Sequence, residues 1–162
     1  MVILACLVGL ILLIKSLYYI RKVYMNTVYK PDMKDWVEEI SLDLEVIKEL
    51  NPLEQTTWAE ITSPITTQEI KEAIDNNKLL NKYYQGDKDW NRNDHVERIA
   101  YLVVNKSDVP IDIDVGIPGM FQVTYIIQDG YHRLAAAYYR GDKTILATIS
   151  GSVKYAKHIL NI

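Results

Sequence analysis

Apolar and polar positions recur along this chain with two different periods, which predict a mixture of helices and strands. Stretches with apolar residues three or four positions apart are typical of amphipathic helices; they are residues 33–50, 66–76 and 94–105. Short stretches rich in β-branched or alternating apolar residues are typical of strands; they are residues 57–61, 110–115, 121–128 and 144–150. Alanine-rich residues 133–140 and the closing residues 153–160 add two helices. We therefore predict an α+β fold, a mixed α/β arrangement of short elements.

The predicted helices differ in how clearly the sequence marks their starts. Thr66 with Glu69, and Asp94 with Glu97, have the spacing of a capping box, so each pair marks the first turn of a helix. The first predicted helix rests on spacing alone, through Trp36, Val37, Ile40, Leu44, Ile47 and Leu50.

The chain has 162 residues, the length of one ordinary domain with an appendage. Its content of 49% hydrophobic and 24% charged residues is typical of a folded protein. We predict three parts: a hydrophobic N-terminal helix or segment over residues 1–24, an amphipathic helical lead-in over residues 25–56, and the α+β domain over residues 57–162.

The N-terminal segment allows two interpretations. Residues 1–20 are apolar apart from an interruption at Lys15 and Ser16, and Arg21 and Lys22 follow them. A membrane-spanning helix needs about 20 mainly apolar residues. Under the first interpretation residues 1–20 anchor the protein to the membrane, and the basic pair keeps the folded domain in the cytoplasm. Under the second, a soluble cytoplasmic protein starts at Met25. Both stay open at the level of sequence.

Composition limits the kinds of site that we expect. The only cysteine, Cys6, excludes a disulfide within the chain and a cysteine-based metal cluster. His95, His132 and His158 lie far apart in sequence without the spacing of metal ligands, so we expect no zinc and no haem. Residues 1–25 carry a net charge of +3 and the remainder a net charge of −6. An acidic domain disfavours nucleic acid as a partner.

One motif carries candidate chemistry, IQDGYHRLAAAYYRGD at residues 127–142. Gly130 permits a tight turn between the strand and the helix, and the N-terminus of a helix attracts phosphate. Arg133 can bind phosphate with two N–H groups, and His132 can move a proton near neutral pH. A purely structural interpretation is equally simple: Asp129 caps the helix, the basic side chains lie on the surface and the alanines pack.

The motif also resembles a known signature. Asp-Gly-x-His-Arg-Leu-Ala-Ala-Ala, followed by Gly-Asp and a β-rich run, is similar to the ParB/sulfiredoxin-like superfamily, as is the preceding HVERIAYLVVN…VPIDIDV. The similarity covers roughly residues 57–150. It implies a small mixed sheet with flanking helices, in which the motif loop holds the phosphates of a nucleotide. The residues that it implies for ligand binding are Gly130, Tyr131, His132 and Arg133.

Departures from the superfamily narrow the expected activity. Sulfiredoxin has its catalytic cysteine just before His-Arg, where this chain has Tyr131. Partition proteins of the ParB type continue into a helix-turn-helix domain, whereas only a short segment follows the motif helix here. The superfamily's free-serine kinases use the motif Asp with an upstream Glu. Asp129 matches the first, and Glu60 matches the second weakly.

Two functional hypotheses follow from the resemblance. In the first, the domain is an enzyme acting on phosphoryl groups, such as a phosphotransferase, NTPase or nuclease. Its catalytic residues would be Asp129, His132 and Glu60, and a nucleotide would bring Mg²⁺ as cofactor. In the second, it is a non-catalytic phosphate-binding regulatory or interaction module of a phage or mobile element. Both predict that residues 129–133 form a strand-to-helix turn facing a concave surface, with Arg133 exposed enough that its loss leaves stability almost unchanged.

Overall fold

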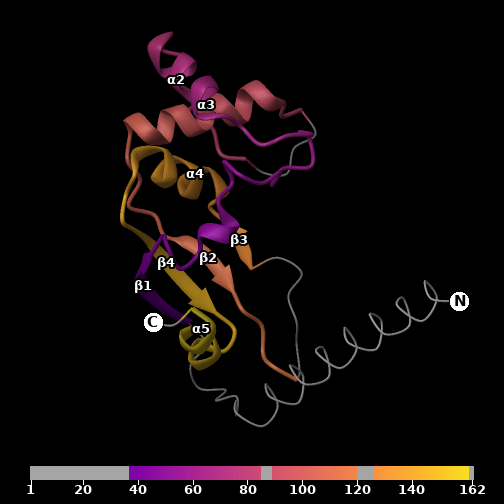
Figure 1. Ribbon diagram of the computed structural model, residues 1–162, viewed down its shortest axis with the longest axis vertical. Helices are drawn as coiled ribbons and strands as arrows, with labels where there is room; N and C mark the ends of the chain where they lie inside the picture. The colour runs from indigo at the N-terminus through magenta and orange to yellow at the C-terminus, as the bar shows by residue number, and fades with distance from the viewer. Residues whose placement is uncertain (1–36, 85–88, 120–125, 161–162) are drawn as a thin grey trace, which may run out of the picture.

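The predicted α+β class is confirmed. The computed structural model describes residues 37–84, 89–119 and 126–160, and within them a four-stranded sheet is accompanied by four α-helices and a 3₁₀ turn (Figure 1). The predicted N-terminal segment, residues 1–24, lies outside these residues. None of the helices in the described ranges has the length and apolar character needed to cross a bilayer. The elements are β1 (Val37–Asp43), η1 (Lys48–Leu50), α2 (Thr67–Asp75), α3 (Arg92–Val104), β2 (Ile111–Asp114), β3 (Ile127–Asp129), α4 (Tyr131–Arg140), β4 (Thr144–Ser150) and α5 (Val153–Leu160).

The sheet has the strand order β1-β4-β2-β3. β4 pairs antiparallel with β1 and parallel with β2, so Ala147 lies opposite Ile40 on one side and Ile111 on the other. β2 and β3 pair antiparallel. The predicted strand over residues 121–128 falls largely on residues that are not described, and its described part is the start of β3.

The predicted helix over residues 33–50 is wrong. Residues 37–43 form β1, and only residues 48–50 make a single 3₁₀ turn. Leu42 and Leu44 are buried while Ser41 and Asp43, which alternate with them, are exposed, which is the two-residue period of a strand. The predicted helical lead-in therefore contributes an edge of the sheet, because β1 pairs with β4 along its whole length.

The predicted strand over residues 57–61 is also wrong. This segment forms irregular turns, and Trp58 and Ile61 point into the core beside the helices rather than into the sheet. The few apolar side chains of this segment pack into the core from a loop. A short apolar run in the sequence does not distinguish such a loop from a strand.

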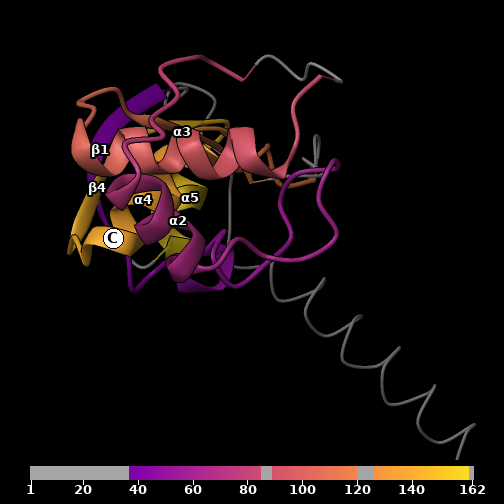
Figure 2. The ribbon, with the colours of Figure 1, turned by 90° about the horizontal axis from the view of Figure 1, so that it is seen from above.

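Helix α4 lies between the sheet and the pair α2 and α3 (Figure 1), and viewed from above all three helices overlie one another (Figure 2). Two hydrophobic clusters meet on it. Leu134 and Ala137 belong to the cluster formed with the sheet and α5, whereas Ala135 and Ala136 belong to the cluster formed with α2 and α3. These four residues are at most 1% exposed. The alanines of the motif therefore serve close packing on two sides of one helix.

The observed helix ends agree with the predicted caps except at the start of α3. The capping box of α2 forms as predicted, with the Glu69 N–H donating to Thr66 Oγ1 at 3.2 Å. Helix α3 starts earlier than predicted, because Asn91 is its N-cap and Asp94 is the reciprocal partner. Gly141 ends α4 in the left-handed conformation, with φ of 70°.

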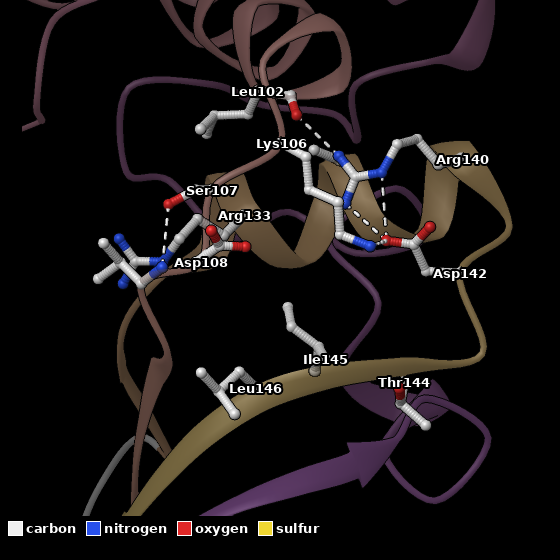
Figure 3. A pocket seen from close by; sticks show the side chains of 12 residues that line it. Leu102, Lys106, Ser107, Asp108, Arg133, Arg140, Asp142, Thr144, Ile145 and Leu146 are labelled. Carbon is white, nitrogen blue, oxygen red and sulfur yellow. Dashed lines mark hydrogen bonds and ion pairs between the residues drawn. The ribbon is translucent and has the colours of Figure 1, made fainter.

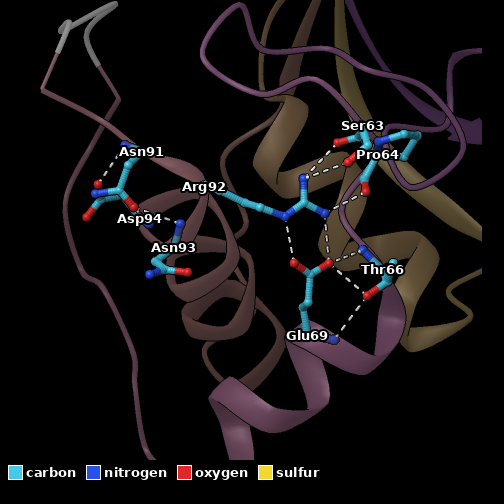
Figure 4. Close-up of polar contacts among 8 residues, drawn as sticks. All are labelled: Ser63, Pro64, Thr66, Glu69, Asn91, Arg92, Asn93 and Asp94. Atoms are coloured by element: carbon cyan, nitrogen blue, oxygen red, sulfur yellow. Dashed lines mark hydrogen bonds and ion pairs between the residues drawn. The ribbon is translucent and has the colours of Figure 1, made fainter.

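Helices α2 and α3 are joined by a cluster of charged and polar groups (Figure 4). Arg92, at the start of α3, donates from Nε and Nη2 to the carboxylate of Glu69 at 2.6 and 2.9 Å. The same guanidinium donates to the carbonyl oxygens of Ser63 and Pro64, both at 2.8 Å. This two-pronged ion pair holds the pKa of Glu69 down at about 2 and fixes the start of α3, the helix that carries His95 and Arg98.

Candidate functional site

The turn between β3 and α4 has the predicted form. Gly130 has φ of 105°, a conformation that glycine adopts far more easily than other residues. A Cβ atom at this position would lie 2.5 Å from Cγ2 of Ile111 in β2. Asp129 Oδ1 accepts the Gly130 N–H at 2.7 Å, and the Gly130 carbonyl accepts the Leu134 N–H at 2.9 Å. Gly130 therefore brings the N-terminus of α4 directly against the sheet.

A cavity of about 470 Å³ opens at this turn. Its volume is within the range of roughly 300–1,000 Å³ typical of small-ligand sites. The five motif residues from Asp129 to Arg133 all line it, whereas Glu60 does not. The lining residues are Thr57, Trp58, Ala59, Tyr83, Tyr84, Arg98, Leu102 and residues 127–133.

Arg98 gives this cavity a buried cation that the sequence analysis did not identify. It is only 5% exposed, and Nη1 donates to Asn81 Oδ1 at 3.3 Å. Its guanidinium lies over the rings of Tyr83 and Tyr101, at 4.9 and 5.3 Å from their centroids. Burial lowers its pKa, and no carboxylate in the described part of the chain forms an ion pair with it. Among the described residues, the charge of Arg98 is therefore offset by aromatic faces, an amide oxygen and the more distant Leu80 carbonyl at 3.5 Å, all of them uncharged.

Arg133 is less exposed than predicted. Its side chain is 12% exposed, and Nη2 donates both to the Pro110 carbonyl and to Asp129 Oδ2, each at 3.0 Å. Nε is buried without a hydrogen-bond partner. Removal of the side chain would leave the Pro110 carbonyl without this donor, so the expectation that its loss leaves stability unchanged does not fit the geometry.

The cavity wall carries more positive than negative charge. Asp129 is the only carboxylate among its described lining residues, and its side chain is 70% exposed. Arg98, Arg133 and the positive end of the α4 dipole line the same cavity, and Asp129 is paired with Arg133. This imbalance favours an anionic ligand.

His132 lies in a buried chain of polar groups, not on the surface. Its Nε2 is 3.0 Å from Nδ1 of His95, and the two residues are 9% and 0% exposed. Nε2 of His95 lies 3.6 Å from Oε2 of Glu60, which is longer than a hydrogen bond, so this nitrogen is buried without a full partner. Oε1 of Glu60 accepts the hydroxyl of Tyr84 at 2.7 Å. The fold thus joins two histidines that the sequence analysis treated as unrelated.

Aromatic rings enclose the two histidines. Trp58 stacks on His132 with centroids 4.8 Å apart and lies 4.7 Å from His95. Trp90 lies 5.3 Å from His95 and 5.7 Å from His132, and Tyr84 packs against both. These rings cover His95 completely and leave only the cavity-facing part of His132 open.

The enclosure determines the protonation states. Burial lowers the pKa of His95, and it lowers the pKa of His132 much further, with help from His95 and from the charges of Arg98 and Arg133. Both imidazoles are therefore neutral at neutral pH. The Tyr84 hydroxyl lowers the pKa of Glu60, so this carboxyl is charged.

The predicted site residues are therefore only partly brought together. Asp129, Gly130, Tyr131, His132 and Arg133 share the cavity, whereas Glu60 lies behind its wall, in contact with the lining residue Tyr84 and with His95. Four further residues of the site were not predicted from the sequence, and the sequence carries a signal for only one of them, His95. His95 is four residues before Ile99, so it lies on the buried face of α3. The missed residues are Trp58, Tyr84, His95 and Arg98.

A smaller cavity of about 190 Å³ lies on the other side of Arg133 (Figure 3). Its other charged groups neutralise one another. Arg140 donates to the Leu102 carbonyl and to Asp142, both at 2.7 Å, and Lys106 lies 3.3 Å from the same carboxylate. We therefore assign this cluster to the connection between α3, α4 and β4.

Comparison with known proteins gives no identification. No protein-family model matches the sequence, and neither a curated protein nor a solved structure is significantly similar to it. The resemblance to the ParB/sulfiredoxin-like superfamily therefore stays a prediction from the motif.

Proposed function

We propose that this protein binds a phosphate-bearing ligand, in the first instance a nucleotide, in the cavity at the Gly130 turn. The observation that carries the proposal is Arg98, a guanidinium buried in the cavity wall with no carboxylate partner in the described residues. Burying an unpaired charge is costly, and a bound anion would offset that cost.

The surroundings of Arg98 support the same ligand class. Arg133 and the first turn of α4 lie across the cavity, so phosphate oxygens would meet two arginines and the end of a helix. Tyr83, Tyr84 and Trp58 add flat apolar faces to the same wall. Such faces stack on a planar ring, which a nucleobase supplies.

The motif supports a phosphate ligand independently. In the ParB/sulfiredoxin-like superfamily, which Asp129 to Arg133 resemble, this loop holds nucleotide phosphates. We accordingly interpret the protein as a domain of that type, with Gly130, Tyr131, His132 and Arg133 as ligand-binding residues.

Magnesium does not fit the site as a protein-held ion. The described residues contain no group of three acidic, histidine or cysteine side chains that could hold a metal. Asp129, the carboxylate at the cavity, is already engaged by the Gly130 N–H and by Arg133. Any Mg²⁺ would therefore come bound to the phosphates of the nucleotide.

Two alternatives differ in what the bound ligand does. A regulatory or interaction module of a phage or mobile element would bind it without turnover. A phosphotransferase, NTPase or nuclease would use His132, Asp129 and Glu60 on it. The buried contacts of Glu60, His95 and His132 favour turnover.

Titration calorimetry with ATP, GTP, CTP and UTP tests the binding proposal. We expect one of them to bind, and we expect Arg98→Gln to weaken that binding by about 10- to 100-fold, because a charge-assisted hydrogen bond contributes roughly 1.5–3 kcal/mol. Arg98→Lys keeps the charge but loses the planar fork of donors, so its affinity should fall between those of the wild type and Arg98→Gln.

Lys71→Gln is the matched control. It removes one positive charge from an exposed position on α2, where Lys71 pairs with Asp75. We expect it to bind like the wild type. Equal binding by Arg98→Gln and Lys71→Gln, or no binding of any of the four nucleotides to the wild type, would contradict the proposal.

A further inference from the structure

We propose that Glu60, His95 and His132 form a proton-transfer chain that makes the protein a nucleoside triphosphatase, with His132 as the general base. This inference rests on the proposed function, because it needs a phosphate ligand in the cavity. The chain begins at a carboxylate behind the cavity wall and ends at an imidazole that lines the cavity.

The groups around the two rings favour one placement of the protons. The anionic Glu60 carboxylate faces Nε2 of His95 at 3.6 Å, too far for a full hydrogen bond but close enough to favour the tautomer with its hydrogen on that nitrogen. A neutral imidazole has a single N–H, so Nδ1 of His95 is an acceptor. Nε2 of His132, at 3.0 Å from that nitrogen, must then be the donor.

This arrangement leaves Nδ1 of His132 with a free lone pair. His132 keeps 9% of its surface exposed and lines the cavity, and its other nitrogen is already bonded to His95. Nδ1 is therefore the polar ring atom that a ligand can meet. Glu60 sets the tautomer of His132 indirectly, through the ring of His95, and is therefore a positioning residue.

The charged groups around the two rings keep them in the basic form. His95 faces Glu60 and Asp94, whose charges oppose the effect of burial, and burial prevails. His132 faces Arg98 and Arg133, whose charges add to the effect of burial. Both rings are thus neutral, and a neutral imidazole can accept a proton.

The reaction step balances as hydrolysis of the terminal phosphate. A water oxygen forms a bond to the γ-phosphorus while one of its protons passes to Nδ1 of His132. The bond from that phosphorus to the β–γ bridging oxygen breaks, and its electron pair leaves with the nucleoside diphosphate. The Nε2 proton of His132 moves to His95, and the Nε2 proton of His95 moves to Glu60. Protons return along the same path, and one is released to water.

This chain places charges where the site can hold them. Passing the proton on to Glu60 keeps a positive charge from remaining on His132 between two arginines, since Glu60 is anionic beforehand. Arg98 and Arg133 stabilise the negative oxygens of the phosphoryl group during attack. A packing role alone would not account for Nε2 of His95, which is buried without a hydrogen-bond partner and turned toward the Glu60 carboxylate.

Nitrogen-15 NMR of the histidine rings tests the chain in the full-length protein without any ligand. We expect His95 and His132 both to carry their hydrogen on Nε2. The variant Glu60→Gln should reverse both rings, because the amide group of glutamine can donate to Nε2 of His95 and turn it into an acceptor. A wild-type His132 with its hydrogen on Nδ1 would overturn the proposal, and this measurement needs no variant.

Phosphate release from ATP, GTP, CTP and UTP, measured together with calorimetric binding, tests the activity. For the nucleotide that binds, we expect Glu60→Gln to lower kcat by at least about 100-fold, the usual contribution of a general base, while Kd changes less than about threefold. His95→Phe keeps a ring in the aromatic enclosure, and it should likewise lower kcat by at least about 100-fold with little change in Kd. Glu72→Gln, the same chemical change on the exposed face of α2, should match the wild type.

The outcomes separate this inference from the proposed function. A wild type that binds a nucleotide but releases no phosphate from any of the four refutes the triphosphatase and leaves the binding proposal standing. Unchanged kcat in a folded Glu60→Gln variant refutes the chain. No binding of any nucleotide refutes the proposed function and this inference with it.

Discussion

At the scale of single residues, Gly130 carries the heaviest constraint in the motif. Two independent features require glycine: the positive φ of 105° and the approach to Ile111, where any Cβ would come within 2.5 Å of a side-chain carbon and 3.0 Å of Cα. The Cα atom of Ile111 belongs to the backbone of β2, so it cannot move away without distorting the sheet.

We expect Gly130→Ala to lower the free energy of unfolding by about 2–6 kcal/mol, from backbone strain of about 1–3 kcal/mol and overpacking of about 1–3 kcal/mol. Gly141→Ala separates the two causes, because Gly141 also has positive φ, 70°, but nothing lies within 4 Å of its hypothetical Cβ. It should cost only about 1–2 kcal/mol. Denaturant unfolding measures both, and equal losses would show that the approach to Ile111 is harmless.

The residues of the candidate site were predictable only where they adjoin in sequence. The turn at Gly130 follows from a β-rich run, a glycine and an alanine-rich run, all within one short stretch. The pairing of His95 with His132 depends on how α3 packs across α4, and no local pattern encodes that crossing. Arg98 was missed for a related reason: a charged residue in a helix is usually exposed, and only tertiary packing buries this one.

At the scale of elements, most of the secondary structure followed from periodicity and caps, and β1 did not. Ile40 and Leu44 are four residues apart, a separation that fits both a helical turn and two strand repeats. Leu42 fits only the strand, and it is fully buried. The deciding influence is β4, whose pairing with β1 involves residues at the far end of the chain and overrides local preference.

The ion pair between α2 and α3 predicts how stability depends on pH. The folded-state pKa of Glu69, at about 2, is below the unfolded value, so its contribution is complete above about pH 4.3 and is lost as the pH falls toward 2. Because the Glu69 side chain is 33% exposed, solvent screening reduces the contribution to about 1–2 kcal/mol. Glu69→Gln should therefore be less stable than the wild type at pH 7 by about that amount.

The difference between Glu69→Gln and the wild type should disappear near pH 2. Urea unfolding at several pH values measures it, with Glu72→Gln as a control on the exposed face of the same helix. A difference that stays constant down to pH 2 would show that Glu69 acts through packing or capping, not through its charge.

At the scale of the whole molecule, α4 unites two hydrophobic clusters in one body. The sheet cluster and the helix cluster each include residues of its Leu-Ala-Ala-Ala segment. Neither cluster can lose α4 without exposing the other, so the described residues should unfold together.

We expect a protein that lacks residues 1–24 to be soluble and to unfold in one cooperative transition. The reason is that residues 37–160 contain both clusters and all four strands of the sheet. Thermal unfolding followed by circular dichroism, compared with the full-length chain, measures this. A shortened protein that precipitates, and recovers only when residues 1–24 are restored, would show that the N-terminal segment belongs to the core.

The position of β4 has a consequence for synthesis on the ribosome. β4 is the last strand to be made, yet it lies inside the sheet between β1 and β2, and Val37 pairs with Ser150. Until residue 150 has emerged, the nascent chain can form only local structure such as α2, α3 and the β2–β3 hairpin. Contacts between such distant residues form slowly, and unpaired strands aggregate easily. Nascent β1 therefore stays unpaired with β4 until residues 144–150 have been made, and during that time its open edge is exposed to aggregation.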